Sequence, residues 1–211
     1  MITRALIVIN VLAYIWEIYT GALRSDAALI RDGVLIPQLV LENHEWWRII
    51  TAGFLHGGLA HIGLNMLSLY WLGRFIEVVL GSWRMLLVYF VSLIVSGLTI
   101  VFFSAPNVPT LGASGAIFGL FGALFAIGIK LGSRGTDLVR SNIGILVLNL
   151  IFSFTFPGIS WQAHVGGLIA GFLFTYVIFY PPKPVYTPVY DTQSGAQYDS
   201  HLEMPDDQQR Y

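Results

Sequence analysis

The stretch TLGASGAIFG, residues 110–119, places Ser114 between glycines at the start of a long apolar run. A serine in front of an apolar helix ordinarily caps the first backbone N–H groups with its hydroxyl. The same hydroxyl becomes a nucleophile when a neighbouring base takes its proton. The role of Ser114 therefore depends on which polar residues the rest of the chain brings to it.

The composition is typical of a membrane protein. Of the 211 residues, 55% are hydrophobic and only 11% are charged, whereas soluble domains carry about 25% charged residues. The net charge of −1 leaves no basic surface for nucleic acid, and the lack of cysteine excludes disulfides and thiolate metal sites. We therefore expect an all-α protein whose main surroundings are the lipid bilayer.

Six apolar segments are long enough to cross a bilayer as helices. They cover residues 2–19, 59–75, 85–103, 115–130, 139–154 and 163–180. A long polar connector separates the first two segments. We predict one helical domain, residues 1–180, followed by a disordered tail, residues 181–211, which is rich in Pro, Gln and Asp.

The distribution of basic residues orients this bundle. With the N-terminus inside, eight of the 11 Lys and Arg residues fall in inner segments. The other three, Arg24, Arg31 and Arg48, lie in the first connector. The prediction is that both termini are inside, that the tail is cytoplasmic and that the first connector is outside.

Ionisable and amide side chains inside spans are costly, so they mark candidate functional sites. His61 and Asn65 are four residues apart and lie on one face of the second span. His164 begins the sixth span and shares its face with glycines three and seven residues later. Small residues also line the fourth span, so close packing of these two helices is expected to carry His164 towards Ser114.

The helical rise places these groups at a similar depth. Ser114 precedes Lys130 by 16 residues, which is about 24 Å of helix in a hydrocarbon core about 30 Å thick. The same estimate sets His61 and His164 in the outer part of the bilayer. We expect all three to share one cavity that opens to the outside.

These residues supply the parts of an acyl-transfer site. Histidine is the usual base for a serine nucleophile, so His164 is predicted to activate Ser114. The developing oxyanion needs hydrogen-bond donors. Asn65, His61 and the backbone N–H of Ser114 are the candidate donors.

The carboxylates of the spans are not placed to complete a catalytic triad. Glu17 and Glu77 are the only ones near the spans, and they fall at opposite ends of the membrane. A serine–histidine dyad is therefore predicted. The amides of Asn10 and Asn149 have no evident partner motif and are expected to bond between helices.

Over residues 1–180, this sequence resembles the rhomboid family of intramembrane serine proteases. The segments that carry the resemblance include a Glu-x-Trp-Arg motif, a two-histidine and asparagine pattern, an inner turn, a nucleophile motif and a base motif. In that order they are ENHEWWRIIT (42–51), FLHGGLAHIGLN (54–65), EVVLGS (77–82), LGASGAIFGLFG (111–122) and AHVGGLIAG (163–171).

The resemblance implies a six-helix rhomboid-like bundle, N-in and C-in, with a partly embedded first loop. It implies that Ser114 is the nucleophile and that His164 is the base and then the acid. His61, Asn65 and the Ser114 N–H are implied to bind the oxyanion. The implied activity is that of a serine endopeptidase, without cofactor or metal, which cleaves transmembrane protein substrates in or near their membrane segments through an acyl-enzyme.

The resemblance also assigns residues around the site. Trp47, Arg48 and His56 are expected to be structural. Many family members carry a tyrosine four residues after the nucleophile, and this chain has Phe118 there. Its ring can still stack on the histidine. Separately from the resemblance, an N-in chain without targeting segments is expected in a prokaryotic plasma membrane, with the site open to the outer face; an organelle membrane is the alternative.

Two other interpretations remain open from the sequence. One is a polytopic transporter or metal-binding membrane protein that uses His56, His61 and His164, since zinc accepts such nitrogen ligands. It leaves Ser114 unexplained, and the chain has no HExxH motif. The other is a catalytically inactive relative that only binds membrane proteins, which the presence of both Ser114 and His164 disfavours.

Overall fold

The computed structural model describes residues 1–182, 188–190 and 197–199. The chain divides into two units, Met1–Phe179 and Tyr180–Tyr211. All the α-helices described belong to the first unit, which also contains every residue predicted to act in the site.

The second unit contains a short pair of strands. β1 (Pro188–Tyr190) and β2 (Gln197–Asp199) pair antiparallel, with Val189 opposite Tyr198. The disorder predicted for 181–211 falls mostly outside the described residues, and it stays a prediction.

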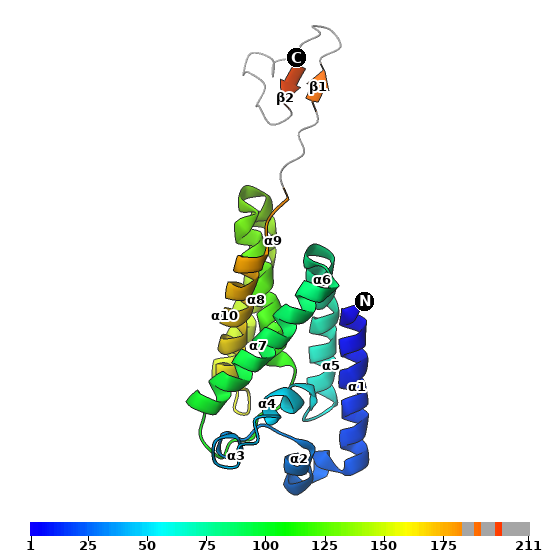
Figure 1. Cartoon of the computed structure of the whole chain (residues 1–211), viewed down its shortest axis with the longest axis vertical. Coiled ribbons are helices and arrows are strands. Elements are labelled where there is room, and N and C mark those ends of the chain that lie inside the picture. The colour runs from blue at the N-terminus through cyan, green and yellow to red at the C-terminus, as the bar shows by residue number, and fades with distance from the viewer. Residues whose placement is uncertain (183–187, 191–196, 200–211) are drawn as a thin grey trace. The chain divides into compact units, whose positions relative to one another are not determined.

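Each of the six predicted spans forms a helix (Figure 1). Five helical segments in the described part of the chain are long and apolar enough to cross a membrane, and the remaining one, α8, is a shorter apolar helix. The predicted all-α membrane bundle is therefore confirmed. Its helices are α1 (Ile2–Thr20), α5 (Leu59–Ser68), α6 (Arg74–Leu80), α7 (Ser82–Phe103), α8 (Ser114–Lys130), α9 (Thr136–Thr155) and α10 (Trp161–Ile178).

The second span is longer than predicted. A π-helical turn, Leu69–Gly73, joins α5 to α6, so that the helical segment continues to Leu80 rather than ending at residue 75. The extension includes Glu77, a charge that ordinarily marks the membrane boundary. Its carboxylate accepts four hydrogen bonds of 2.6–3.1 Å, which stabilise it inside the bundle. The donors are the N–H groups of Ile2 and Thr3 and the hydroxyls of Thr3 and Ser82.

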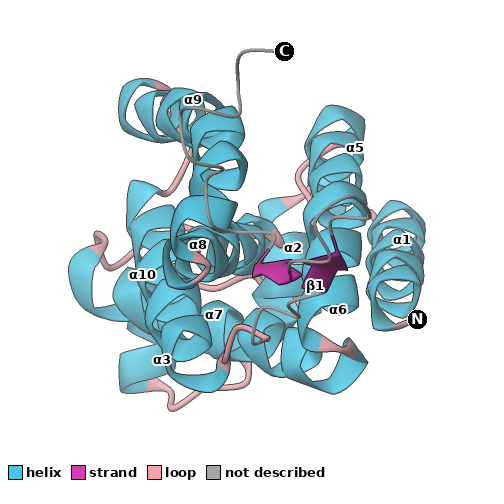
Figure 2. Cartoon of the chain, turned by 90° about the horizontal axis from the view of Figure 1, so that it is seen from above, coloured by secondary structure: helices cyan, strands magenta, loops and turns pink. Residues whose placement is uncertain are grey.

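Helix α8 lies in the centre of the bundle. Its residues from Gly115 to Gly128 are all buried, and it contacts α7, α9 and α10 (Figure 2). A helix that is apolar on every face can be buried on every side, whereas an amphipathic helix keeps its polar face away from the protein core. Ser114 therefore lies at the start of a helix that is buried along most of its length.

Glycines bring α8 and α10 into backbone contact. A Cβ built on Gly167 would lie 1.9 Å from the carbonyl oxygen of Gly115, and one on Gly171 would lie 2.0 Å from that of Gly119. Only glycine allows helix backbones to approach this closely. The predicted contact between the fourth and sixth spans is present, and it sets the distance between the helices that carry Ser114 and His164.

The first connector folds into short helices at the end of the bundle opposite the N-terminus (Figure 1). It contains 3-10 turns at Ala22–Arg24 and Ala52–Phe54. It also contacts the segment that precedes α8, because Leu35 and Thr110 exchange backbone hydrogen bonds of 3.1 and 2.8 Å. The connector helices are α2 (Asp26–Asp32), α3 (Pro37–Glu42) and α4 (Arg48–Thr51).

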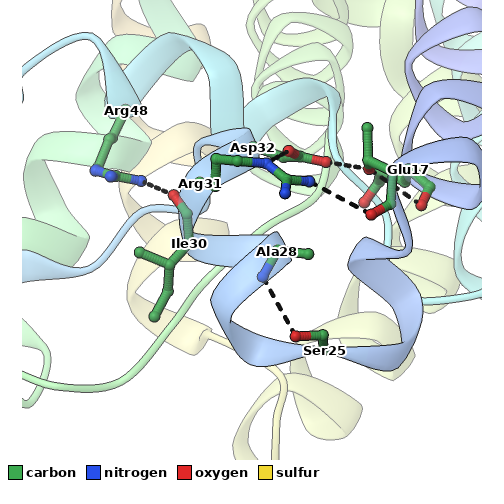
Figure 3. Close-up of polar contacts among 8 residues, drawn as sticks. Glu17, Ser25, Ala28, Ile30, Arg31, Asp32 and Arg48 are labelled. Carbon is green, nitrogen blue, oxygen red and sulfur yellow. Dashed lines mark hydrogen bonds and ion pairs between the residues drawn. The ribbon is translucent and has the colours of Figure 1, made fainter.

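Arg48 holds the connector together. Its Nη1 donates to the carbonyl oxygen of Ile30 at 2.8 Å (Figure 3). The same Nη1 donates to the carbonyl oxygen of Val34 at 2.9 Å, and Nε donates to the carboxylate of Glu45. The guanidinium is buried and lies 4.5 Å from the ring centroid of Trp47. The structural role expected for Arg48 rests on these contacts.

Replacing Arg48 by lysine is expected to destabilise the protein by about 1–3 kcal/mol, because a single ammonium does not reproduce the forked donors of the guanidinium. Thermal denaturation in detergent measures this. The matched control is Arg31→Lys, since Arg31 pairs with Asp32 at 3.0 Å from an exposed side chain, where about 0.5 kcal/mol or less is expected. Equal effects of the two changes would contradict a structural role for Arg48.

Candidate active site

Ser114 is the first residue of α8, yet its hydroxyl does not cap the helix. The N-cap position belongs to Ala113, and no side chain makes a cap hydrogen bond there. Instead the Ser114 Oγ lies 2.8 Å from Nε2 of His164, fifty residues further along the chain. The capping interpretation of Ser114 is therefore excluded, and its hydroxyl is free to interact with the imidazole.

His164 occupies the first turn of α10. The helix begins after Ser160, whose hydroxyl accepts from the N–H of Ala163 at 3.2 Å. The imidazole is almost fully buried and stacks on Phe118, with ring centroids 4.0 Å apart and planes 9° from parallel. Phe118 therefore supplies the stacking surface expected one turn after Ser114.

His61 and Asn65 both lie on α5. They line a cavity of about 510 Å³ together with Ser114, Phe118 and His164. One N–H of the Asn65 amide donates to the carbonyl oxygen of His61 at 3.0 Å, which leaves the second amide proton available. The four residues predicted for the site thus come from three helices and meet at one cavity.

Gly112 lets the His61 ring approach Ser114. Its φ of 125° is left-handed, and a Cβ there would lie 2.8 Å from His61 Nε2 and 3.8 Å from the Ser114 Oγ. Its N–H donates to the carbonyl oxygen of Ala52 at 2.8 Å, which ties this turn to the connector. Any larger residue at 112 would push the histidine away from the serine.

His56 lies behind His61 and is fully buried. Its backbone N–H donates to both carboxylate oxygens of Glu17 at 3.0 and 2.9 Å, and its ring centroid is 5.1 Å from that of His61. Burial, together with the nearby His61, lowers the pKa of His56 to about 4, so the ring is neutral at pH 7. These contacts support the structural role expected for His56.

Ser153 also contacts His164, although no motif in the sequence marks it as a site residue. This residue lies on α9, and its Oγ is 2.6 Å from Nδ1 of His164. A serine in an apolar helix ordinarily bonds to its own backbone, so it gives no signal of a partner on another helix. The one indication in the sequence is that Ser153 lies one helical turn after Asn149, another polar residue of the same span.

The two amides predicted to bridge helices bond within their own helices. Asn10 Nδ2 donates to the carbonyl oxygen of Leu6 at 2.8 Å, and Asn149 Nδ2 donates to that of Ile145 at 2.8 Å. A side chain reaches the carbonyl four residues back without help from a second helix, which explains why Asn149 differs from the prediction. Asn10 also interacts with the buried side chain of Tyr89 on α7, so its contact between helices is present.

Within the described residues, no group of three or more His, Asp or Glu side chains is arranged to hold a metal ion. His164 makes its two ring hydrogen bonds to serines. The three histidines of the metal-binding interpretation therefore do not form one ligand set.

A serine hydrogen-bonded to a buried histidine, in a cavity of a multi-pass helical bundle, has the form of a serine-hydrolase site inside a membrane protein. Residues 43–181 match the family model of the Rhomboid domain. The chain therefore belongs to the rhomboid family.

Several relatives are similar over most of this chain. It is 34% identical over 171 residues to rhomboid protease GluP of Bacillus subtilis (strain 168), which covers 81% of this chain and 33% of GluP. It is 34% identical over 166 residues to YdcA of the same strain, whose name also refers to a rhomboid protease, covering 78% of this chain and 83% of YdcA. It is 35% identical over 165 residues to Inactive RHOMBOID-like protein 8 of Arabidopsis thaliana, covering 75% of this chain and 46% of the relative.

This chain therefore spans only a third of the length of GluP. Its relatives include a protein named as a protease and one named as inactive. Family membership alone therefore does not distinguish an active protease from an inactive relative. The activity of this chain is inferred from the side chains of its site.

Proposed function

We propose that this protein is an intramembrane serine endopeptidase that cleaves membrane-protein substrates in or near their transmembrane segments. The observation that carries the proposal is the 2.8 Å contact between the Ser114 Oγ and His164 Nε2. A hydroxyl at hydrogen-bond distance from an imidazole is the arrangement that general-base activation requires.

In the proposed reaction, the Ser114 Oγ attacks the scissile carbonyl carbon while His164 Nε2 takes the hydroxyl proton. His164 then gives that proton to the leaving amine, and an acyl-enzyme is left on Ser114. His164 next takes a proton from the water that attacks the ester, and it returns that proton to the Ser114 Oγ as the acyl–oxygen bond breaks and the second product leaves. Asn65, His61 and the Ser114 N–H are the proposed donors to the oxyanion, and all three residues line the cavity.

The proposed substrates follow from the chemistry of a helix. A transmembrane helix keeps its carbonyls in internal hydrogen bonds, so the scissile segment must unwind before attack. Substrates with glycine or other helix-breaking residues near their outer end are therefore favoured. The basic residues outside the spans support N-in and C-in topology, with the cavity open to the outer face of a prokaryotic plasma membrane.

A fluorophosphonate probe and a single-span substrate test this proposal. Wild type is expected to be labelled and to cleave the substrate, and Ser114→Ala is expected to lose both activities. A membrane-impermeant probe applied to intact cells should label Ser114 if the cavity opens outward. Labelling or cleavage that survives in Ser114→Ala would refute the serine mechanism, and chelator-sensitive activity would favour a metal site.

A further inference from the structure

Ser153 makes two short contacts through one oxygen atom. Its Oγ lies 2.6 Å from Nδ1 of His164 and 2.6 Å from the carbonyl oxygen of Asn149. The hydroxyl has a single proton to donate. The position of that proton determines which nitrogen of His164 carries a proton.

The Asn149 contact settles where the proton goes. A carbonyl oxygen only accepts, and two oxygens 2.6 Å apart repel each other unless a proton lies between them. Ser153 therefore donates to Asn149 and can only accept from His164. The proton of the second contact must belong to Nδ1, which leaves Nε2 with a lone pair directed at the Ser114 hydroxyl.

We propose that Ser153 is a positioning residue that keeps His164 in the tautomer a general base needs. The inference rests on the proposed function and deepens it, because the predicted dyad gains a neutral third member. During attack the Ser114 proton moves to Nε2, the imidazole becomes a cation, and Ser153 accepts from Nδ1–H throughout. Ser153 neither gains nor loses a proton.

The placement of Ser153 on α9 supports this role. Most of that helix is exposed on the periphery of the bundle, and Ser153 and Leu146 are its two buried side chains. Ser153 does not line the 510 Å³ cavity. It is therefore placed to act on the chemistry through His164 and not by touching the substrate.

Two alternative substitutions of Ser153, by valine and by threonine, separate the effect of the hydroxyl from the effect of side-chain shape. Ser153→Val is expected to lower kcat for the single-span substrate by about tenfold to a hundredfold, the range for one lost charge-assisted hydrogen bond. KM should stay within about twofold, because Ser153 does not reach the cavity. Ser153→Thr keeps the hydroxyl and should restore kcat to within about threefold of wild type. Ser153→Ala, which adds no atoms to the buried site, should match the valine variant.

Thr155→Val is the matched control. Thr155 lies on the same helix, and its hydroxyl makes the same kind of bond, to the carbonyl oxygen of Ile151 at 2.8 Å, from an exposed position. This variant should keep wild-type kcat. Thermal midpoints in detergent distinguish loss of fold from loss of rate.

The result that would overturn the inference is a kcat near wild type in Ser153→Val and Ser153→Ala, or a kcat in Ser153→Thr as low as that of the valine variant. Full cleavage by Ser114→Ala would instead overturn the proposed function itself. If Ser114→Ala is inactive while Ser153→Ala and Ser153→Val remain fully active, only the inference about Ser153 fails.

Discussion

Replacing His164 by alanine is expected to lower the rate of substrate cleavage by about four orders of magnitude or more, the scale on which catalytic pairs act together. The hydroxyl of Ser114 has its 2.8 Å contact with this imidazole. Without the imidazole, the Ser114 hydroxyl must lose its proton to water, and no acid is in place to protonate the leaving amine. Labelling by the fluorophosphonate should disappear as well, since the probe also reacts with an activated serine.

The double variant sharpens this prediction. If Ser114 and His164 act as one unit, removing both should cost no more activity than removing either. The control is His44→Asn in the connector, because His44 is exposed and asparagine tolerates its left-handed φ of 59°. His44→Asn should keep its rate within about twofold. Additive losses in the double variant would show that the two residues act independently.

Adding a single methyl group to Gly171 is expected to unfold or severely loosen the bundle. The new Cβ would lie 2.0 Å from the carbonyl oxygen of Gly119 and 2.5–2.6 Å from its carbonyl carbon and Cα. These are backbone atoms, so relief requires moving α8 away from α10 as a whole. We expect Gly171→Ala to cost about 3 kcal/mol or more, at the upper end of the range for overpacking.

Gly144→Ala provides the matched control for this change. Gly144 is exposed on α9, and a Cβ there would have no atom within 4 Å. The same methyl should be neutral or should stabilise by up to about 1 kcal/mol, because alanine favours helix more than glycine does. Thermal midpoints in detergent measure both variants. Comparable midpoints for Gly171→Ala and wild type would mean that α8 and α10 do not depend on this close contact.

Gly171→Ala is also expected to lose activity in any fraction that stays folded. The contact lies on the interface that sets the separation of Ser114 from His164, and a shift of about 1 Å at a reacting pair can reduce rates about a hundredfold. Cleavage normalised to folded protein measures this effect.

Much of the fold could be predicted because the bilayer restricts a chain so strongly. Six apolar segments with few charges have to be helices, since the membrane interior satisfies no free backbone group. The second span continues past its predicted end, and there a charge has partners elsewhere in the fold. Glu77 does not end its helix because Thr3 and Ser82 bond to its carboxylate.

Part of the candidate site could also be predicted from the cost of polar groups in a membrane. Ser114, His61, Asn65 and His164 stand out as polar residues that the membrane penalises, and all four line one cavity. Ser153 did not stand out, because a serine satisfies itself on its own helix carbonyl at little cost. Only a second contact, from another helix, distinguishes it from the other hydroxyls of the spans.

The order of apolar and polar residues along the chain was enough to predict a bundle of membrane helices and the few polar side chains inside it. These properties depend on hydrophobicity along the chain, which is local. Two contacts could be seen only in the folded bundle. The Ser114 hydroxyl bonds to an imidazole and does not cap its helix, and Ser153 lies on the far side of that imidazole. A hydrogen bond forms only when the donor–acceptor distance is correct to within a few tenths of an ångström. Such distances are set only when the glycine-lined helices pack together.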